Sequence, residues 1–250
     1  DVISVSGNSV SSISALLNLS TSEEKRTEVT KKSKNYYYEY EIKQSLFFEK
    51  FKNISVYQNI HFDYCVFNNI KKCKTYNPYN QKKYLIGYKD TYLTKIVSLW
   101  KLNGSISSVL VWRLLREIRI IDSNLEPEGH KASFNDFFNN LEKDIYSKNY
   151  DLIFAHTLVP HRPYGFDKNC HYDGRLSLRN IFYTQSQHIK QHNIERKCVF
   201  KFLNNFLNNL KKNDYLDNIN LTILSDHGSR ITSNKNSYPS VIYAHRNKKT

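Results

Sequence analysis

Apolar residues recur at intervals of three and four along much of this chain, a spacing that predicts amphipathic helices. The segments with this pattern are 9–18, 105–120, 133–146 and 183–212. In the longest of them, the predicted buried stripe consists of Val199, Leu203, Phe206 and Leu210. Residues 20–45 are instead charged and rich in tyrosine, and we expect a solvated connection there that leads into a helix.

Short apolar runs between polar turns predict strands. Between residues 46 and 95 these runs are ISVY, CVF and YLIGY, and two more, DLIFAH (151–156) and NLTIL (220–224), flank the longest helix. Strand, helix and strand in this order form a βαβ unit, which places two parallel strands in one sheet. We therefore expect an α/β fold with a mostly parallel sheet sandwiched by helices.

The composition sets broad limits on size and partners. The 250 residues suffice for one large core, and 37 Lys and Arg against 23 Asp and Glu give a net charge of +14. This excess suits anionic partners such as phosphate esters, anionic glycans, lipid headgroups or nucleic acid, although abundant Asn, Lys, Ile and Tyr also fit AT-rich coding. No RNA-binding signature or zinc-finger spacing supports the nucleic-acid alternative.

The cysteines, Cys65, Cys73, Cys170 and Cys198, form no CxxC pair, which argues against a zinc ribbon. They leave the redox compartment open, although Cys65 and Cys73 could bridge locally in an oxidising one. No apolar run approaches the roughly 18 residues of a membrane span, and no signal peptide is present. Because the chain starts at Asp1 and has no methionine, we expect a fragment or processed form, with any membrane anchor upstream.

The predicted strands at 151–156 and 220–224 both end in residues that can carry chemistry. In open parallel sheets, ligands bind beyond the carboxyl ends of the strands. Asp226 and His227 place a carboxylate and an imidazole at one such end. This pair suits a divalent metal, zinc or manganese ahead of magnesium or calcium. The alternative is a turn in which Asp226 caps the next segment and His227 is exposed.

The other strand end, FAHTLVPHRPY, carries His156, His161 and Arg162 on a loop stiffened by two prolines. A fixed histidine beside an arginine can bind an anionic oxyester and donate a proton to its leaving group. We expect this role for His161, whereas His156 fits a buried core histidine.

In order along the chain, FAHTLVPHRPYGFD with its following cysteine, the helix start YTQSQ and LTILSDHGSR resemble the sulfatase-like hydrolases and transferases of the alkaline phosphatase superfamily. Sulfatases, lipoteichoic acid synthases and phosphoethanolamine transferases belong to it. The resemblance implies an alkaline phosphatase-like fold, metal ligation by Asp226 and His227, and a place for His161 at the substrate or a second metal. It also implies an anionic small-molecule, glycan or lipid substrate and a location in the cell envelope.

Members of this family place the nucleophile at the start of a helix, in a pattern such as TxxSLxSxLN. SVSSISALLN at 9–18 resembles it, with Ser9 as the nucleophile and Ser12 as the second, substrate-binding serine. A helix N-terminus favours both a bound phosphate or sulfate and a developing alkoxide. A serine at this position is also an ordinary helix cap, and Ser11 and Ser12 are rival nucleophiles.

Two departures from the family pattern refine these expectations. Ser9 is not followed by the xPxR-type pattern of formylglycine sulfatases, which argues against that subgroup. The family's first metal-binding acid lies on a strand before the nucleophile, and only eight residues precede Ser9. We therefore expect the first strand and its metal ligand to be missing.

These features together predict metal-dependent hydrolysis or transfer of a phosphate or sulfate ester through a covalent serine intermediate. We expect one sulfatase-like catalytic domain over residues 1–250, incomplete at its N-terminus. One alternative is a sulfatase without formylglycine that acts on an anionic glycan. Another is a non-catalytic basic module that binds an anionic polymer.

Overall fold

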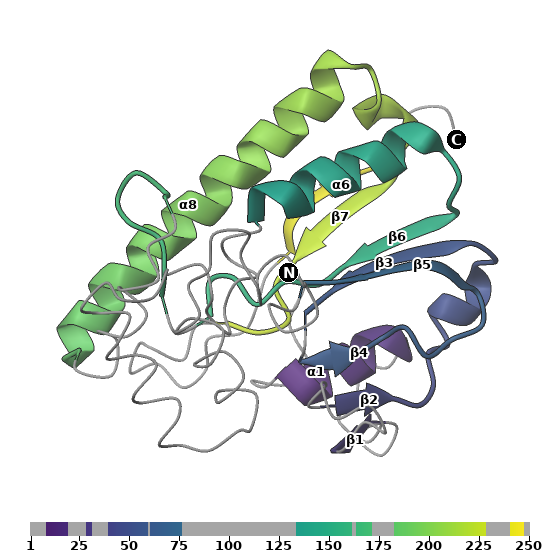
Figure 1. Cartoon of the computed structure of the whole chain (residues 1–250), viewed down its shortest axis with the longest axis horizontal. Coiled ribbons are helices and arrows are strands. Elements are labelled where there is room, and N and C mark those ends of the chain that lie inside the picture. Colours follow the sequence, from purple (N-terminus) through teal and green to yellow (C-terminus); the bar gives the residue numbers. More distant parts are fainter. Residues whose placement is uncertain are drawn as a thin grey trace, which may run out of the picture. The chain divides into compact units, whose positions relative to one another are not determined.

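The computed structural model describes residues 9–19, 29–31, 40–59, 61–76, 134–161, 164–171, 183–228 and 241–247. This part of the chain is a mixed α/β structure with three α-helices and several small sheets (Figure 1). The YLIGY strand and the helix expected at 105–120 lie outside the described residues, as does Arg162.

The chain divides into two compact units. Unit 1 comprises Asp1–Lys74, Phe138–His156 and Leu203–Thr250, and unit 2 comprises Thr75–Phe137 and Thr157–Phe202. Each unit is described by itself below. A single catalytic domain over the whole chain stays a prediction.

The three α-helices begin and end close to their predicted bounds. They are α1 (Ser9–Leu17), α6 (Phe134–Ser147) and α8 (Gln185–Lys212). A capping box starts α8, because Thr184 Oγ1 accepts the Gln187 backbone N–H at 3.3 Å and Gln187 Oε1 accepts the Thr184 N–H at 2.7 Å. Two short 3-10 helices, Phe48–Lys50 and Leu216–Asn218, complete the helical elements of the described residues.

The buried faces of the helices follow the apolar spacing read from the sequence. On α6 the buried residues Phe134, Phe137, Phe138 and Leu141 recur at three and four residues. On α8 the predicted stripe is confirmed at Phe206 and Leu210, which are buried, whereas Val199 and Leu203 are half-buried.

The described strands form three small sheets. In sheet order these are β1 (Val29–Lys31), β2 (Tyr40–Ile42) and β4 (Phe62–Asp63); β5 (Ile70–Thr75), β3 (Ile54–Gln58) and β6 (Leu152–Ala155); and β7 (Leu221–Leu224) with β8 (Val241–His245). The β2–β4 and β3–β6 pairs are parallel, whereas β1–β2 and β7–β8 are antiparallel. The described pairs therefore include both orientations, and a single, mostly parallel sheet stays a prediction.

The two strands that flank α8 are not paired with each other in these sheets. β6 lies in parallel beside β3, with Ile54 opposite Leu152, and β7 lies antiparallel to β8. Among the described strands, β6 and β7 therefore do not share a sheet, whereas the βαβ interpretation placed them as two parallel strands in one sheet. The order of elements does not reveal which neighbour each strand bonds, and the segment VIYAH supplies the partner of β7.

Two predictions for the first part of the chain also need correction. In the described part of residues 20–45 there are two short strands, β1 and β2, rather than a connection into a helix. The CVF run lies in the turn between β4 and β5, whereas ISVY forms β3 and is buried throughout. A short apolar run need not form a strand. Here the run lies in a turn whose Cys65 is disulfide-bonded to Cys73.

One apolar cluster holds α1 in unit 1. Its buried members are Ile13, Leu17, Ile42, Phe48, Ile54, Val56, Phe62 and Tyr64. Burial of one such side chain contributes roughly 1.5–3 kcal/mol, so this cluster fixes the short helix against β2, β3 and β4. The first residue of α1 is thereby held at a defined place in the unit.

All four cysteines are joined in disulfides, Cys65–Cys73 and Cys170–Cys198. The first was foreseen as an option from its short spacing, and the second, with a sequence separation of 28, had no signal in the sequence. Two disulfides are typical of an oxidising environment.

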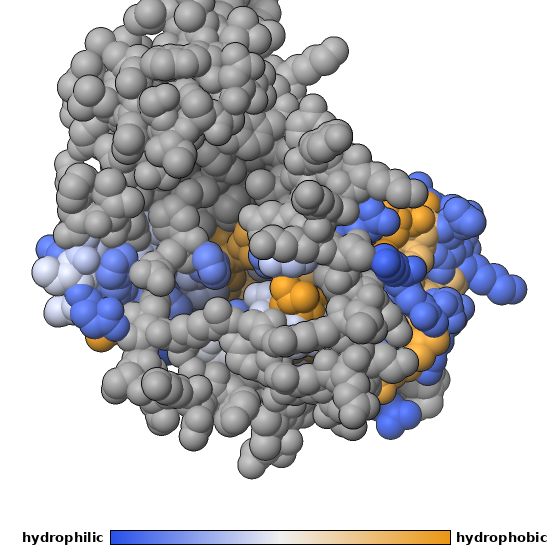
Figure 2. All heavy atoms as spheres, turned by 90° about the horizontal axis from the view of Figure 1, so that it is seen from below, coloured by the Kyte–Doolittle hydropathy of each residue, from blue (hydrophilic) through white to orange (hydrophobic). Residues whose placement is uncertain are grey.

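Within the described ranges, no helix combines the length and the apolar character needed to cross a membrane. Among the coloured residues of Figure 2, hydrophobic side chains lie beside hydrophilic ones.

Candidate active site

Ser9 and His227 meet in unit 1 although they are 218 residues apart in sequence. Ser9 is the first residue of α1, and His227 lies just after the carboxyl end of β7. The hydroxyl oxygen of Ser9 is 3.1 Å from Nε2 of His227. A helix start and a strand end, each predicted to carry chemistry, therefore face each other.

The ring of His227 is oriented by its own backbone. Its Nδ1 lies 2.7 Å from the carbonyl oxygen of Gly228. A carbonyl can only accept a hydrogen bond, so Nδ1 carries the proton and Nε2 of the neutral ring presents a lone pair. Nε2 is therefore able to accept the Ser9 hydroxyl proton or to bind a cation.

Asp226 completes a small set of donor atoms around this nitrogen. Its Oδ1 accepts the backbone N–H of His227 at 2.9 Å, and its Oδ2 lies 3.7 Å from His227 Nε2. The side chains of Asp226 and His227 are 22% and 16% exposed, so a ligand in solution can still reach them.

Two separations within this set are compatible with shared ligation of one divalent ion. Ligands bound to zinc lie at about 2.0–2.2 Å from it, so that two ligand atoms are separated by roughly 3–3.7 Å. The separations at Nε2, 3.1 Å to Ser9 Oγ and 3.7 Å to Asp226 Oδ2, fall in this range. The Gly228 carbonyl also supplies the outer hydrogen bond that metal-binding histidines usually have.

This set of donor atoms nevertheless contains only one carboxylate and one imidazole. Among the residues that the structure describes, no group of three or more His, Cys, Asp or Glu side chains could hold a metal. Asp226 and His227 would supply two such ligands, with the Ser9 hydroxyl as a third donor atom. Water or substrate oxygens would fill the other positions.

The serines of α1 differ in their surroundings. Ser9 is half-buried and contacts His227, whereas Ser11 and Ser12 are only 2% and 7% exposed. Ser12, the expected substrate-binding serine, lies nearly one turn inside the helix. The greater exposure of Ser9 favours it over its two rivals as the group that meets a substrate.

A second polar pair, Tyr64 and His156, lies in the same unit. The Tyr64 hydroxyl is 2.6 Å from Nδ1 of His156, which directly follows β6, and Tyr64 is fully buried. Burial raises the pKa of Tyr64 well above its ordinary value, and the negative charge of Asp226 raises it further. The charge of Asp226 is thus close enough to Tyr64 to affect its pKa.

Burial also lowers the pKa of His156 to about 4, with Asp226 opposing this change and His61 adding to it. Both members of the pair are therefore uncharged near neutral pH. His156 was expected to be a buried core histidine, and the structure shows it half-buried and bonded to Tyr64. Tyr64 was missed by the sequence reasoning, because nothing in the sequence distinguishes it from the other tyrosines.

His161 belongs to unit 2, as residue 161 falls within Thr157–Phe202. Its convergence with Ser9, Asp226 and His227 stays a prediction. The same holds for Arg162, which lies outside the described residues.

Comparisons with family models, with curated proteins and with solved structures find no match for this chain. The geometry of the site and the motifs of the sequence are therefore the grounds for the function proposed below.

Proposed function

We propose that the chain is a metal-dependent hydrolase or transferase that acts on a phosphate or sulfate ester through a covalent intermediate on Ser9. The observation that carries the proposal is the contact of Ser9 Oγ with His227 Nε2 at 3.1 Å, beside Asp226. It joins the helix start and the strand end to which the sequence motifs assign the nucleophile and the metal ligands. The proposal includes membership of the sulfatase-like branch of the alkaline phosphatase superfamily, with its fold.

In this mechanism Asp226 Oδ2 and His227 Nε2 would hold the metal, and Ser9 Oγ is the attacking atom. A bound divalent ion would lower the pKa of a coordinated hydroxyl and offset the negative charge of the ester. The Ser9 hydroxyl proton passes to solvent water, a bond forms from Ser9 Oγ to phosphorus or sulfur, and the bond to the leaving oxygen breaks, with that oxygen taking up a proton from water where it is basic enough. Water or an acceptor alcohol then releases the group from Ser9.

Other parts of the chain assist these steps. The backbone amides in the first turn of α1 favour the anionic group beside Ser9. Tyr64 and His156 are uncharged, so they add polar groups near Asp226 without adding charge. By resemblance, His161 and Arg162 bind the substrate oxyanion, and the enzyme acts on an anionic glycan or lipid of the cell envelope.

The same contact supports a second candidate, a metal-free serine hydrolase. With Nδ1 bonded to Gly228, His227 can take the proton of Ser9 as a general base, so that serine, histidine and carbonyl form a chain. Asp226 would then have no direct part in catalysis.

Turnover of bis(p-nitrophenyl) phosphate and p-nitrophenyl sulfate by the full chain tests both candidates, with zinc or manganese and with a chelator. We expect metal-dependent release of p-nitrophenol, and a loss of roughly a thousandfold or more in Ser9→Ala and Asp226→Asn. Ser14→Ala, buried in the same helix, and Asp214→Asn, exposed and tolerant of asparagine at φ 57°, are the matched controls.

Three results would change the assignment. Turnover that resists the chelator and Asp226→Asn but not Ser9→Ala supports the metal-free candidate. Full activity in Ser9→Ala refutes a serine nucleophile at this position. Absence of turnover together with binding of an anionic polymer favours the non-catalytic basic module.

A further inference from the structure

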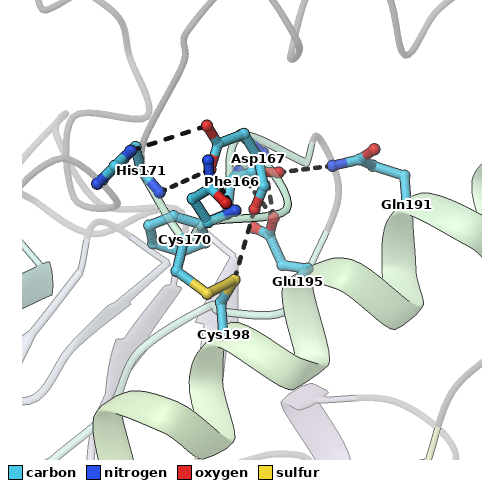
Figure 3. The surroundings of a disulfide bond; sticks show 9 residues. Phe166, Asp167, Cys170, His171, Gln191, Glu195 and Cys198 are labelled. Atoms are coloured by element: carbon cyan, nitrogen blue, oxygen red, sulfur yellow. Dashed lines mark hydrogen bonds and ion pairs between the residues drawn. A yellow bond between two sulfur atoms is a disulfide. The ribbon is translucent and has the colours of Figure 1, made fainter.

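The loop after His161 is attached to α8 by several contacts within unit 2. Its described residues are Tyr164–His171, which begin three residues after His161. Figure 3 shows the side chains of Gln191, Glu195 and Cys198 on α8 directed toward this loop. Residues at positions i, i+4 and i+7 lie on one face of a helix, so the three contacts run along successive turns.

Glu195 makes the central contact. Its side chain is fully buried, and its Oε2 accepts the backbone N–H groups of Gly165 at 3.2 Å and Phe166 at 3.1 Å. A buried carboxyl group is costly unless it is hydrogen-bonded, and an apolar residue would serve packing better at this position. The choice of glutamate is explained by its two loop amides.

Two other residues of the same face strengthen the attachment. Gln191 Nε2 donates to the carbonyl oxygen of Phe166 at 2.7 Å, and Cys198 is bonded to Cys170 (Figure 3). Phe166 thus has both of its backbone polar groups bonded to α8 side chains.

The loop between these anchors is itself ordered. Asp167 Oδ1 accepts the backbone N–H groups of Asn169 at 2.8 Å and His171 at 2.9 Å. Cys170 adopts a positive φ of 68°, an uncommon conformation for a residue other than glycine. The turn is thus closed by hydrogen bonds within the loop.

We infer that Gln191, Glu195 and Cys198 form a clamp that positions the segment carrying His161 for its substrate. The inference rests on the proposed function, in which His161 meets an anionic ester. Glu195 and the Cys170–Cys198 bridge act through His161 and are positioning residues. They explain why a long helix with an exposed, charged outer face keeps a glutamate inside.

Hydrogen exchange of the full chain, followed by mass spectrometry, tests the clamp itself. Glu195→Ala leaves the Gly165 and Phe166 amides without their acceptor, and we expect their exchange to accelerate about tenfold or more. Glu195→Gln keeps an acceptor oxygen and should restore most of the protection. The double variant Cys170→Ser with Cys198→Ser should accelerate exchange at 164–171, whereas Cys65→Ser with Cys73→Ser, the matched control in unit 1, should not.

Turnover of bis(p-nitrophenyl) phosphate tests the positioning role. We expect kcat/KM to fall roughly tenfold in Glu195→Ala and in the Cys170/Cys198 double variant, with recovery in Glu195→Gln. Zinc affinity by calorimetric titration should not change, since Asp226 and His227 belong to unit 1. A general loss of folding would lower both kcat/KM and zinc affinity. A change in kcat/KM alone therefore indicates a positioning role.

The outcomes separate the clamp from the proposed function. Unchanged exchange at 165–166 in Glu195→Ala and in the double variant overturns the clamp. Faster exchange with unchanged kcat/KM overturns the positioning role. If the unaltered chain shows no turnover, the proposed function and the positioning role fail together, and the exchange measurements alone decide whether the clamp exists.

Discussion

Single hydrogen bonds decide what the residues of the candidate site can do. The Gly228 carbonyl holds the proton of His227 on Nδ1, so Nε2 faces Ser9 as an acceptor. The other tautomer, with its proton on Nε2, would direct an N–H at the serine hydroxyl. Its Nε2 would then have no lone pair left to bind a cation. The backbone next to His227 therefore matters as much for the chemistry as the side chain does.

Tyr64→Phe tests the buried pair behind Asp226. The change removes the hydroxyl that lies 2.6 Å from His156 Nδ1 and keeps the ring. Because a buried imidazole then loses a bond, we expect the free energy of unfolding to fall by about 1–3 kcal/mol in urea denaturation. Tyr40→Phe is the control, since the half-buried Tyr40 hydroxyl bonds no described residue. Equal losses in both variants would contradict the assigned bond.

At the scale of elements, Asp144 ties α6 to two strands of unit 1. Its carboxylate accepts Ser55 Oγ and Tyr57 Oη, both at 2.6 Å, from β3, and it pairs with Lys72 Nζ of β5 at 2.6 Å. The Asp144 side chain is 8% exposed and that of Lys72 is 34% exposed. The buried end of this cluster thus depends on hydrogen bonds, and the outer end is partly screened by water.

This cluster predicts a loss of stability in acid. Burial alone would raise the pKa of Asp144, but the bonds from Lys72, Ser55 and Tyr57 lower it below its ordinary value. A carboxyl whose pKa is lowered on folding stabilises the fold above its unfolded pKa of about 3.9. That contribution disappears as the pH falls through the lower, folded value.

Asp144→Asn removes the negative charge that Ser55, Tyr57 and Lys72 bond. We expect it to reduce the free energy of unfolding at pH 7 by about 1–3 kcal/mol and to flatten its dependence on pH below about 4. Urea denaturation between pH 2 and pH 7, at values chosen about the carboxyl pKa, measures both effects. Glu49→Gln, at an exposed position, should leave both unchanged. If Asp144→Asn kept the same loss of stability in acid, other carboxyl groups would have to cause that loss.

The elements differ in how far the sequence could predict them. The bounds of α1, α6 and α8 follow from periodic apolar residues, and those of β6 and β7 follow from short apolar runs between polar turns. Strand neighbours could not be predicted, because β8 bonds to β7 through residues that no local pattern marks as its partner. Local spacing records the burial of an element and says little about its hydrogen-bonded neighbour.

The same limit applies to the sites. Ser9, Asp226 and His227 were found through motifs that combine a chemical group with a strand end or a helix start. Tyr64 is one of 19 tyrosines, and its partner lies 92 residues away, so no local signal identified it. Glu195 was missed because a glutamate on an amphipathic helix is normally exposed, and its buried place depends on a loop brought to it by the fold.

At the scale of the whole molecule, covalent bonds are distributed between the units. Cys65–Cys73 closes the β4–β5 turn in unit 1, and Cys170–Cys198 joins a loop to α8 in unit 2. The sequence separations are 8 and 28 residues. In the chain-entropy description, closing loops of these sizes stabilises a fold by about 2.5 and about 3.5 kcal/mol.

This distribution allows the stability of unit 2 to be followed separately. Residues 164–171 and 185–198 belong to unit 2, so the hydrogen exchange of their backbone amides in urea reports on that unit. We expect the double variant Cys170→Ser with Cys198→Ser to lower the stability obtained from this exchange by about 3.5 kcal/mol. The same result should follow in the unaltered chain under reductant.

The control is the bridge of the other unit. Cys65→Ser with Cys73→Ser should leave the exchange of these unit 2 amides unchanged and shift only the far-ultraviolet circular dichroism, which reports on both units. Separate transitions would mean that the units unfold independently, so that one free energy cannot describe the whole chain. Equal shifts of both signals in both double variants would instead mean that the units unfold as one. In that case each bridge stabilises the entire molecule, and the division into units has no thermodynamic counterpart.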